Sequence, residues 1–308
     1  MHRAHRCWEV RARNADGCPA IFGRKAFGPF LMAEKGKEMT FLEHLEELRW
    51  TLMRSAIAVV TGMIVAFCFK QFVFDTIILA PQRPDFITYR VFCWASHRFG
   101  MDQSFCMSTA GFTIMNTKMG GQFITHLTVS FTLGAILAMP YVLWEIWRFI
   151  RPGLKEKERG SVSGVVFYAS VLFLFGVVFG YFVLAPLSVQ FLGPYSVSAS
   201  VSNLVDLDSY IGTVTSLTLW TGVVFELPMV VLFMARIGII GPAFLRTYRK
   251  HAFVIILIIA AIITPPDVTS QILVTIPLMA LYELSIFLAA RAQRGRDRLA
   301  TSTVTSAR

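Results

Sequence analysis

The sequence contains a series of uninterrupted apolar segments, and most of them are long enough to cross a lipid bilayer as helices. A helix needs about 20 predominantly apolar residues to span a hydrocarbon core of about 30 Å. The long segments are Thr51–Val73, Gln122–Ile150, Val162–Leu184, Tyr210–Ala235 and Thr269–Ala290, and a shorter one is Ala252–Thr264. We therefore expect an all-α integral membrane protein with six transmembrane helices, and a long loop, 74–121, after the first.

The composition agrees with a membrane protein and argues against other classes. Of the 308 residues, 55% are hydrophobic and only 16% are charged, and the mean hydropathy is +0.59. The net charge of +10 raises the question of nucleic-acid binding. No basic patch is interleaved with exposed aromatic residues, so no nucleic-acid partner is expected. The sequence also lacks P-loop, zinc-protease and nucleophile-elbow motifs. We therefore expect no enzymatic activity and no cofactor or metal site.

Lysine and arginine residues are concentrated on alternate loops, and this predicts the orientation of the chain. In membrane proteins the short cytoplasmic loops carry an excess of these residues. Basic clusters follow the second and fourth apolar segments and fill the C-terminal tail, whereas 192–209 and 264–270 contain no lysine or arginine. Both termini are therefore expected in the cytoplasm.

Three parts are expected along the chain. Residues 1–38 are irregular and rich in arginine, and they lack the apolar core of a signal peptide. We interpret them as a disordered or wrongly assigned leader, with Met32 or Met39 as the true start. Residues 39–290 form the membrane domain, and residues 291–308 form a basic cytoplasmic tail.

The first helix is predicted to begin as an amphipathic segment, Thr40–Met53, at the cytoplasmic surface. Thr40 and Glu43 have the spacing of a capping box, and leucines recur on one side at helical spacing. The other sides carry a cluster of acids that includes Glu47. This places carboxylates just outside the membrane, on a side that is otherwise basic.

Two cytoplasmic acids, Glu47 and Glu158, stand among basic residues. Each can pair internally, Glu47 with Arg49 and Glu158 with Arg159. Alternatively, each can receive a cationic ligand, because carboxylates accept arginine in a planar, bidentate geometry. The residues alone leave both possibilities open.

Glu226 lies inside the fourth apolar segment, in the sequence VVFELPMVV. Burying a carboxylate in lipid costs at least about 2.5 kcal/mol, so it should face protein or water. Ionisable residues within membrane segments usually serve function, and the alternative here is a neutral, hydrogen-bonded structural glutamate. Pro228 should kink the helix close to this point.

The remaining polar residues allow simpler roles. Asp267 can cap the sixth helix, and Glu283 and Glu145 can reach the surface or pair with a basic loop. Cys93 and Cys106 share the long loop after the first segment and can form a disulfide in an oxidising compartment.

Taken together, these residues resemble the TatC family, the polytopic subunit of the twin-arginine, or Sec-independent, protein translocase. The similarity extends from about Thr40 to Ala290. It rests on FLEHLEELR (41–49), MPYVLWEIWRFIRPGLKEKER (139–159), FGYFVLAP (179–186), FELP (225–228) and TPPDVTSQ with the IP and YE after it (264–283). The order and spacing of these segments make the resemblance specific.

The resemblance implies a concave, glove-like bundle with short fifth and sixth helices. It also implies a receptor that exports folded proteins across the bacterial cytoplasmic (inner) membrane, driven by the proton gradient. Expected partners are twin-arginine signal peptides, single-span TatA- or TatB-type subunits, lipid, and further copies of this chain. An ion-coupled transporter of a small cationic solute, with Glu226 as the coupling acid, is the alternative function.

The family motifs also assign roles to residues of this chain. The positions that match the signal-peptide site are Glu47, Leu48, Arg49, Phe149, Glu158 and Arg159. The positions that match the intramembrane or partner-contact site are Pro81, Pro140, Glu226, Pro228, Asp267 and Glu283.

Overall fold

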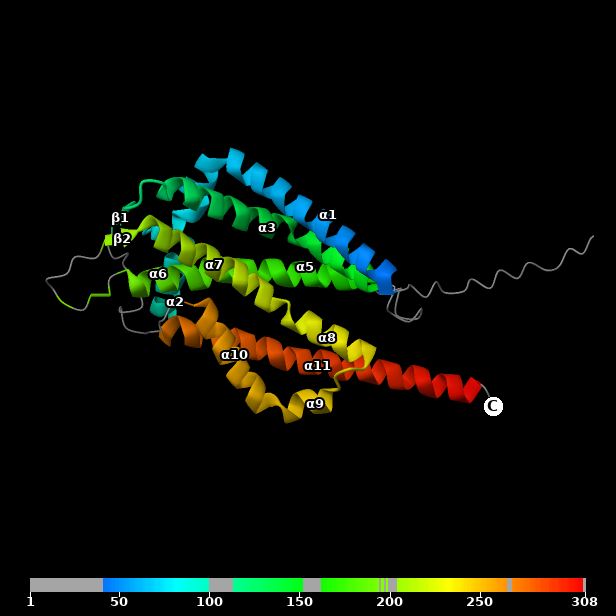
Figure 1. The fold of residues 1–308 in the computed structure, drawn as a ribbon. Helices are drawn as coiled ribbons and strands as arrows, with labels where there is room; N and C mark the ends of the chain where they lie inside the picture. The colour runs from blue at the N-terminus through cyan, green and yellow to red at the C-terminus, as the bar shows by residue number, and fades with distance from the viewer. Residues whose placement is uncertain are drawn as a thin grey trace, which may run out of the picture. The chain divides into compact units, whose positions relative to one another are not determined.

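The computed structural model describes residues 41–99, 113–151, 162–193, 195–196, 198, 204–264 and 268–306. The chain divides into two compact units, Met1–His44 and Leu45–Arg308, and the second contains nearly all of the described residues. This second unit is built almost entirely of helices (Figure 1).

The helices in chain order are α1 (Phe41–Cys68), α2 (Ile87–Phe99), α3 (Gly121–Ile150), α5 (Val162–Phe179), α6 (Ala185–Leu192), α7 (Leu207–Phe225), α8 (Leu227–Ile237), α9 (Pro242–Thr247), α10 (Arg249–Ile263) and α11 (Val268–Ser306). The shorter turns are the π-helices η1 (Phe72–Ile78) and η5 (Gly180–Leu184) and the 3₁₀ helix η2 (Ala80–Gln82). The strands β1 (Thr113–Met115) and β2 (Leu204–Asp206) pair in parallel.

The predicted all-helical membrane architecture is confirmed. Within the described part of the chain, five helical stretches are long and apolar enough to cross a membrane, namely Leu42–Cys68, Gly121–Ile150, Gly164–Leu192, Leu207–Ala235 and Gln271–Arg291. Each overlaps one of the five long segments predicted from the sequence, with bounds that differ by up to nine residues. The sixth predicted segment forms α10, which has only 15 residues and is therefore short, as expected.

Two expectations about the helices were wrong. The loop predicted over 74–121 contains α2, a helix of 13 residues, because residues 85–99 include no proline or glycine to interrupt it. The sixth helix is not short, since α11 runs for 39 residues and continues through most of the predicted polar tail. The tail contains no proline, so nothing in its sequence forces the helix to end at the membrane surface.

Glycines bring α5 and α7 into close backbone contact. A Cβ atom added to Gly176 would lie 2.9 Å from Cα of Gly222, and one added to Gly180 would lie 3.0 Å from the Leu217 carbonyl oxygen. Gly176 and Gly180 have the GxxxG spacing that lets membrane helices approach closely. These two helices therefore form the packed centre of the bundle, with Phe173 and Leu217 fully buried beside them.

A second glycine contact holds α1 against α3. A Cβ atom added to Gly134 would lie 2.4 Å from the backbone nitrogen of Met63, and one added to Gly62 would lie 2.9 Å from the Gly134 carbonyl oxygen. Most of α1 is not covered by other parts of the protein, since only 11% of the residues in its most apolar stretch are buried. Figure 1 shows α1 running beside α3 along one side of the helices. The position of α1 therefore depends on a few contacts.

Polar contacts join the two chain segments that precede α3 and α7. Asp206 accepts hydrogen bonds from the backbone nitrogen and the hydroxyl of Thr117, at 3.2 and 2.9 Å. These bonds hold the pKa of Asp206 below its ordinary value. Lys118 donates to Asp208 at 2.7 Å, and this bond raises the pKa of the lysine. Both contacts extend the β1–β2 pairing.

We expect Gly134→Ala to lower the melting temperature of the detergent-solubilised protein by several degrees, because the new methyl group would collide with the α1 backbone. Overpacking of this kind costs about 1–3 kcal/mol. Differential scanning fluorimetry measures the change. The control is Gly212→Ala on an exposed part of α7, where an added Cβ meets nothing within 4 Å. Equal melting temperatures for the two variants would contradict the close α1–α3 packing.

Candidate functional site

The predicted signal-peptide residues of α1 lie in its first turns. The side chains of Leu48 and Arg49 are exposed, and Glu47 is half-buried. The Oε2 atom of Glu47 is buried and accepts no hydrogen bond from any residue that the structure describes. A buried carboxylate oxygen without a donor is costly, so this oxygen is ready to accept one.

Three contacts determine which face of α1 turns toward α3. At the midpoint of α1, Nη1 of Arg54 lies 3.8 Å from Oε2 of Glu145. About two turns further along α1, the two backbones meet at glycine. Near the C-terminal end of α1, the ring of Phe67 stacks on His126, with centroids 4.0 Å apart and planes 13° apart. The residue numbers rise along α1 and fall along α3, so the helices run antiparallel.

These contacts also orient Glu47. Glu47 precedes Arg54 by seven residues, which is two helical turns, so both side chains leave α1 on nearly the same side. Glu47 therefore lies about 10 Å further toward the start of α1, beside the C-terminal end of α3. The segment that follows α3 carries Glu158 and Arg159, which lie outside the described residues. Proximity of Glu47 and Glu158 remains a prediction.

The C-terminal part of α3 contains two further predicted site residues, Phe149 and Pro140, and one residue, Glu145, whose burial was not expected. Phe149 is half-buried at the end of the helix, and Pro140 is accommodated inside it without a break. Glu145, for which the sequence predicted only surface exposure or loop pairing, is 1% exposed. Its Oε1 atom accepts a hydrogen bond of 3.0 Å from the hydroxyl of Tyr141. Sequence alone gave no sign of this burial, because both neighbouring tryptophans also suit a lipid-facing surface.

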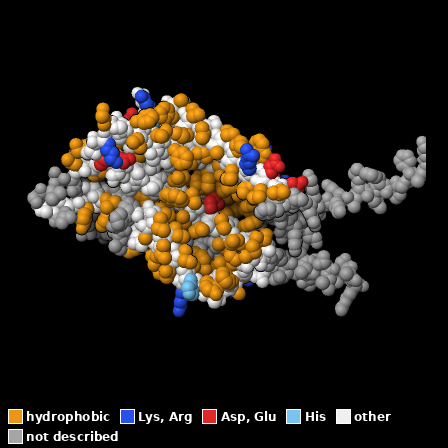
Figure 2. Space-filling view, in the orientation of Figure 1, with side chains coloured by type: hydrophobic (Ala, Val, Ile, Leu, Met, Phe, Trp, Pro, Cys, Tyr) orange, Lys and Arg blue, Asp and Glu red, His pale blue; other side chains and the backbone are white. Residues whose placement is uncertain are grey.

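Glu226 occupies the break between α7 and α8. Its backbone nitrogen bonds to the Val223 carbonyl at 3.1 Å, and α8 begins at the next residue with Pro228 in its first turn. The proline kink predicted from the sequence is therefore present. The side chain is 8% exposed, and Oε1 has no hydrogen-bond donor among the described residues. Figure 2 shows acidic atoms recessed in an apolar face, in the region where Figure 1 places this break.

Tyrosine hydroxyls fix the turn that contains Pro81. The turn follows α1, and its carbonyls are not all used by helical hydrogen bonds. Tyr181 donates to the Ile77 carbonyl at 2.6 Å, Tyr210 donates to the Ile78 carbonyl at 2.9 Å, and Tyr89 donates to the Pro81 carbonyl at 2.7 Å. Three separate helical elements thus hold the buried Pro81 in place.

The other predicted residues are more scattered. Glu283 pairs with Arg249 at 2.7 Å, with both side chains about half exposed, and so connects α11 to α10. Asp267 lies outside the described residues. Cys93 is disulfide-bonded; Cys106 lies outside the described residues, so the Cys93–Cys106 pairing remains a prediction.

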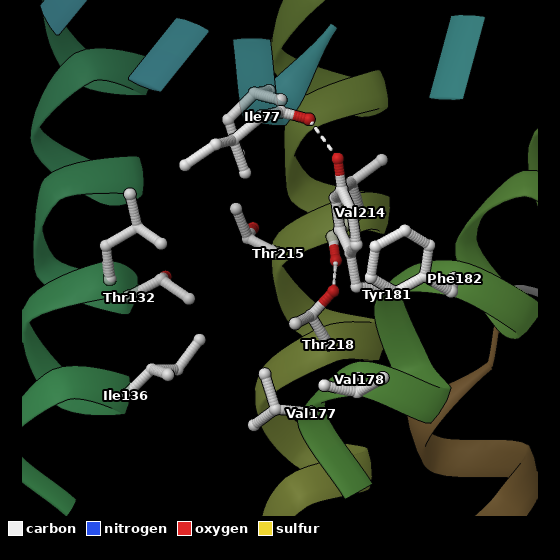
Figure 3. A pocket seen from close by; sticks show the side chains of 12 residues that line it. Ile77, Thr132, Ile136, Val177, Val178, Tyr181, Phe182, Val214, Thr215 and Thr218 are labelled. Atoms are coloured by element: carbon white, nitrogen blue, oxygen red, sulfur yellow. Dashed lines mark hydrogen bonds between the residues drawn. The ribbon is translucent and has the colours of Figure 1, made fainter. Parts of the chain in front are cut away.

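An apolar cavity of about 180 Å³ lies between α3, α5, α7 and the turn after α1 (Figure 3). Three threonines lie in its wall, and two of them, Thr215 and Thr218, donate their hydroxyls to carbonyls of their own helix at 2.6 and 2.7 Å. These hydroxyls are therefore satisfied, and the remaining lining is mostly aliphatic and aromatic. The cavity offers van der Waals contacts and no charged group.

The family whose model matches this chain is described as Sec-independent protein translocase protein (TatC), and the match covers residues 43–277. Among relatives, the Sec-independent protein translocase protein TatC of Blattabacterium sp. subsp. Periplaneta americana is 38% identical over 263 residues, which cover 84% of this chain and 97% of the relative. The TatCy protein of Bacillus subtilis is 32% identical over 260 residues, covering 84% of this chain and 92% of the relative.

Solved structures agree with these sequence comparisons. A crystal structure of the twin-arginine translocase receptor TatC is 31% identical and superposes with a TM-score of 0.62, covering 82% of this chain and all of that one. A second crystal structure of a TatC receptor, in the detergent DDM, is 32% identical with a TM-score of 0.65, covering 80% of this chain and 99% of that one.

We expect Tyr89→Phe to loosen the turn around Pro81, because it leaves a buried carbonyl without its donor, at a cost of about 1–3 kcal/mol. Amide hydrogen exchange over residues 77–90 should become faster than in the unaltered protein. The matched control is Tyr168→Phe, which makes the same change at an exposed tyrosine of α5. Unchanged exchange in Tyr89→Phe would contradict this role.

The same hydroxyl predicts a pH dependence. Burial raises the pKa of Tyr89 to about 12, above the ordinary tyrosine value of about 10. The stabilisation from this protonated hydroxyl is therefore complete below about pH 10 and is lost as the pH rises from 10 toward 12. Between pH 10 and 12, amide exchange over residues 77–90 should accelerate in the unaltered protein by more than the intrinsic exchange rate rises with pH. In Tyr89→Phe this extra acceleration should be absent.

Proposed function

The chain belongs to the TatC family of Sec-independent protein translocases, and from this premise we propose that it is the signal-peptide receptor and assembly core of a twin-arginine translocase. It binds the two adjacent arginines of a signal peptide at the cytoplasmic surface and takes part in the export of folded proteins across the bacterial inner membrane. The proton gradient supplies the energy. In this role the chain is a receptor, not an enzyme.

The single observation that carries the proposal is the unsatisfied oxygen of Glu47. Its Oε2 atom is buried and lacks a donor among the described residues. By helical spacing Glu47 stands two turns before Arg54, on the side of α1 that meets α3. An arginine guanidinium is planar, keeps its charge and offers several N–H donors, so it satisfies such an oxygen better than lysine does. Glu158, a few residues beyond α3 in the chain, would take the second arginine.

Glu226 supports the second part of the proposal, contact with TatA- or TatB-type subunits. A carboxylate within an apolar face costs free energy if it has no polar partner, even where the helix is broken. A polar side chain on a single-span partner helix would supply the donor that Oε1 lacks. The ion-coupled transporter, which also uses Glu226, is not favoured, because the chain matches translocase subunits over most of its length.

We expect Glu47→Lys and Glu158→Lys each to weaken binding of a twin-arginine peptide at least tenfold, because each replaces an attractive charge with a repulsive one. Microscale thermophoresis on the detergent-solubilised full chain measures the dissociation constant. The control is Glu46→Lys, which makes the same charge change at the exposed neighbouring residue of α1. Wild-type affinity in both of the first two variants would refute the proposed site.

We expect Glu226→Leu to abolish export of a folded reporter while binding of the twin-arginine peptide stays within about twofold of wild type. The physical reason is that leucine fills the space but cannot accept a hydrogen bond from a partner helix. Export is measured in cells that lack their own copy of this subunit, and co-purification reports retention of the single-span subunits. Normal export and co-purification in Glu226→Leu would rule out this role.

A further inference from the structure

We propose that Glu145 is a positioning residue for the signal-peptide site: through its ion pair with Arg54 it holds the N-terminal half of α1, and with it Glu47, against the end of α3. This inference rests on the proposed function, because Glu47 must be the receptor carboxylate for its position to matter. It adds a residue that does not itself touch the peptide.

Glu145 is an unusual residue for its surroundings. It is 1% exposed, although it is a carboxylate near the end of a membrane helix. Its Oε1 atom is satisfied by Tyr141, but Oε2 accepts no hydrogen bond from any described residue. A buried charge of this kind is tolerated only where opposite charges lie close by.

Two arginines supply that charge from different helices. Arg54 on α1 approaches Oε2 at 3.8 Å, and Arg148 on α3 approaches Oε1 at 3.9 Å. Both guanidinium groups are about half exposed, at 44% and 52%. Only the Arg54 contact joins two helices, since Arg148 lies one turn from Glu145 on the same helix. The guanidinium of Arg148 also lies 5.8 Å from the ring centroid of Trp144, so both of these contacts of Arg148 are with residues of its own helix.

The position of α1 is sensitive to this one pair. Contacts that hold α1 to α3 include the Arg54–Glu145 pair at the midpoint of α1, the glycine crossing about two turns further along, and the stacked Phe67–His126 pair near its C-terminal end. Without the ion pair, the polar contact of Arg54 with α3 is lost, and packing such as that of Thr51, which is 6% exposed, is left to hold this half of α1. The helix can then pivot about the glycine crossing.

Such a pivot moves Glu47 more than any other residue of the site on α1. Glu47 lies fifteen residues before Gly62, which is about 22 Å along the helix. A rotation of a few degrees at the crossing therefore displaces the carboxylate by more than 1 Å. Bidentate recognition of a guanidinium needs closer alignment than that, whereas attraction of a compact ammonium group does not.

The test compares twin-arginine and twin-lysine peptides on the full chain in detergent. We expect Glu145→Gln and Arg54→Gln each to weaken binding of the twin-arginine peptide about threefold to tenfold. Binding of the twin-lysine peptide should change little, so the ratio of the two affinities falls. The double variant should lose no more than either single variant, because both remove the same contact.

Two matched variants complete the series. Arg54→Lys keeps the charge and should retain the specificity ratio. Arg148→Gln removes the other arginine beside the same carboxylate and should also retain the ratio, since it does not join two helices. If Glu145→Gln fails to accumulate, Arg54→Gln still decides the question, because it removes the same contact from the half-exposed side.

Several results would overturn the proposal. Additive losses in the double variant would show that the residues act independently. A loss in Glu145→Gln with wild-type binding in Arg54→Gln would mean that Glu145 contacts the peptide directly. Glu47→Gln in the same series distinguishes failure of the proposed receptor site from failure of the proposed role of Glu145. If it binds normally, the proposed receptor site fails; if it alone loses binding, only the role of Glu145 fails.

Discussion

Close approach of helix backbones at glycine is the constraint on which the rest of the structure depends. Lipid tails are as apolar as leucine, so membrane helices gain little by hiding apolar side chains from lipid and associate mainly by close packing. Gly176 and Gly222 allow this between α5 and α7, and Gly62 and Gly134 allow it between α1 and α3. The first contact builds the centre of the bundle. The second contact places the helix that carries the proposed receptor carboxylate.

Polar side chains then fix what the glycines leave free. The turn after α1 departs from regular helix, and three tyrosine hydroxyls satisfy its carbonyls. Buried backbone carbonyls must be paired within the protein, because an unpaired one costs about as much as a lost hydrogen bond. The tyrosines therefore act as rigid supports around Pro81. The cavity beside them remains apolar, since the hydroxyls of Thr215 and Thr218 bond to their own helix.

Among the described residues, three carboxylates have a buried oxygen without a hydrogen-bond donor, and each has a different environment. Glu226 lies in a helix break, Glu145 lies between two arginines, and Glu47 is half-buried near the start of α1. Only Glu145 has its charge balanced within the described part of the chain. That difference is why we assign Glu145 to holding the helices together and the other two to binding outside groups.

The sequence by itself determined the membrane class, the helical segments, the shortness of α10 and the kink before Pro228, because these follow from local hydrophobicity, length and backbone chemistry. It also identified Glu47 and Glu226 as exceptional, since charge in an apolar or basic stretch is visible without coordinates. It did not reveal α2 or the length of α11. The burial of Glu145 and its contact with Arg54 were decided only by tertiary structure, because two residues ninety-one positions apart meet through the register of α1 on α3. That register is set by glycines whose partners no local pattern can identify.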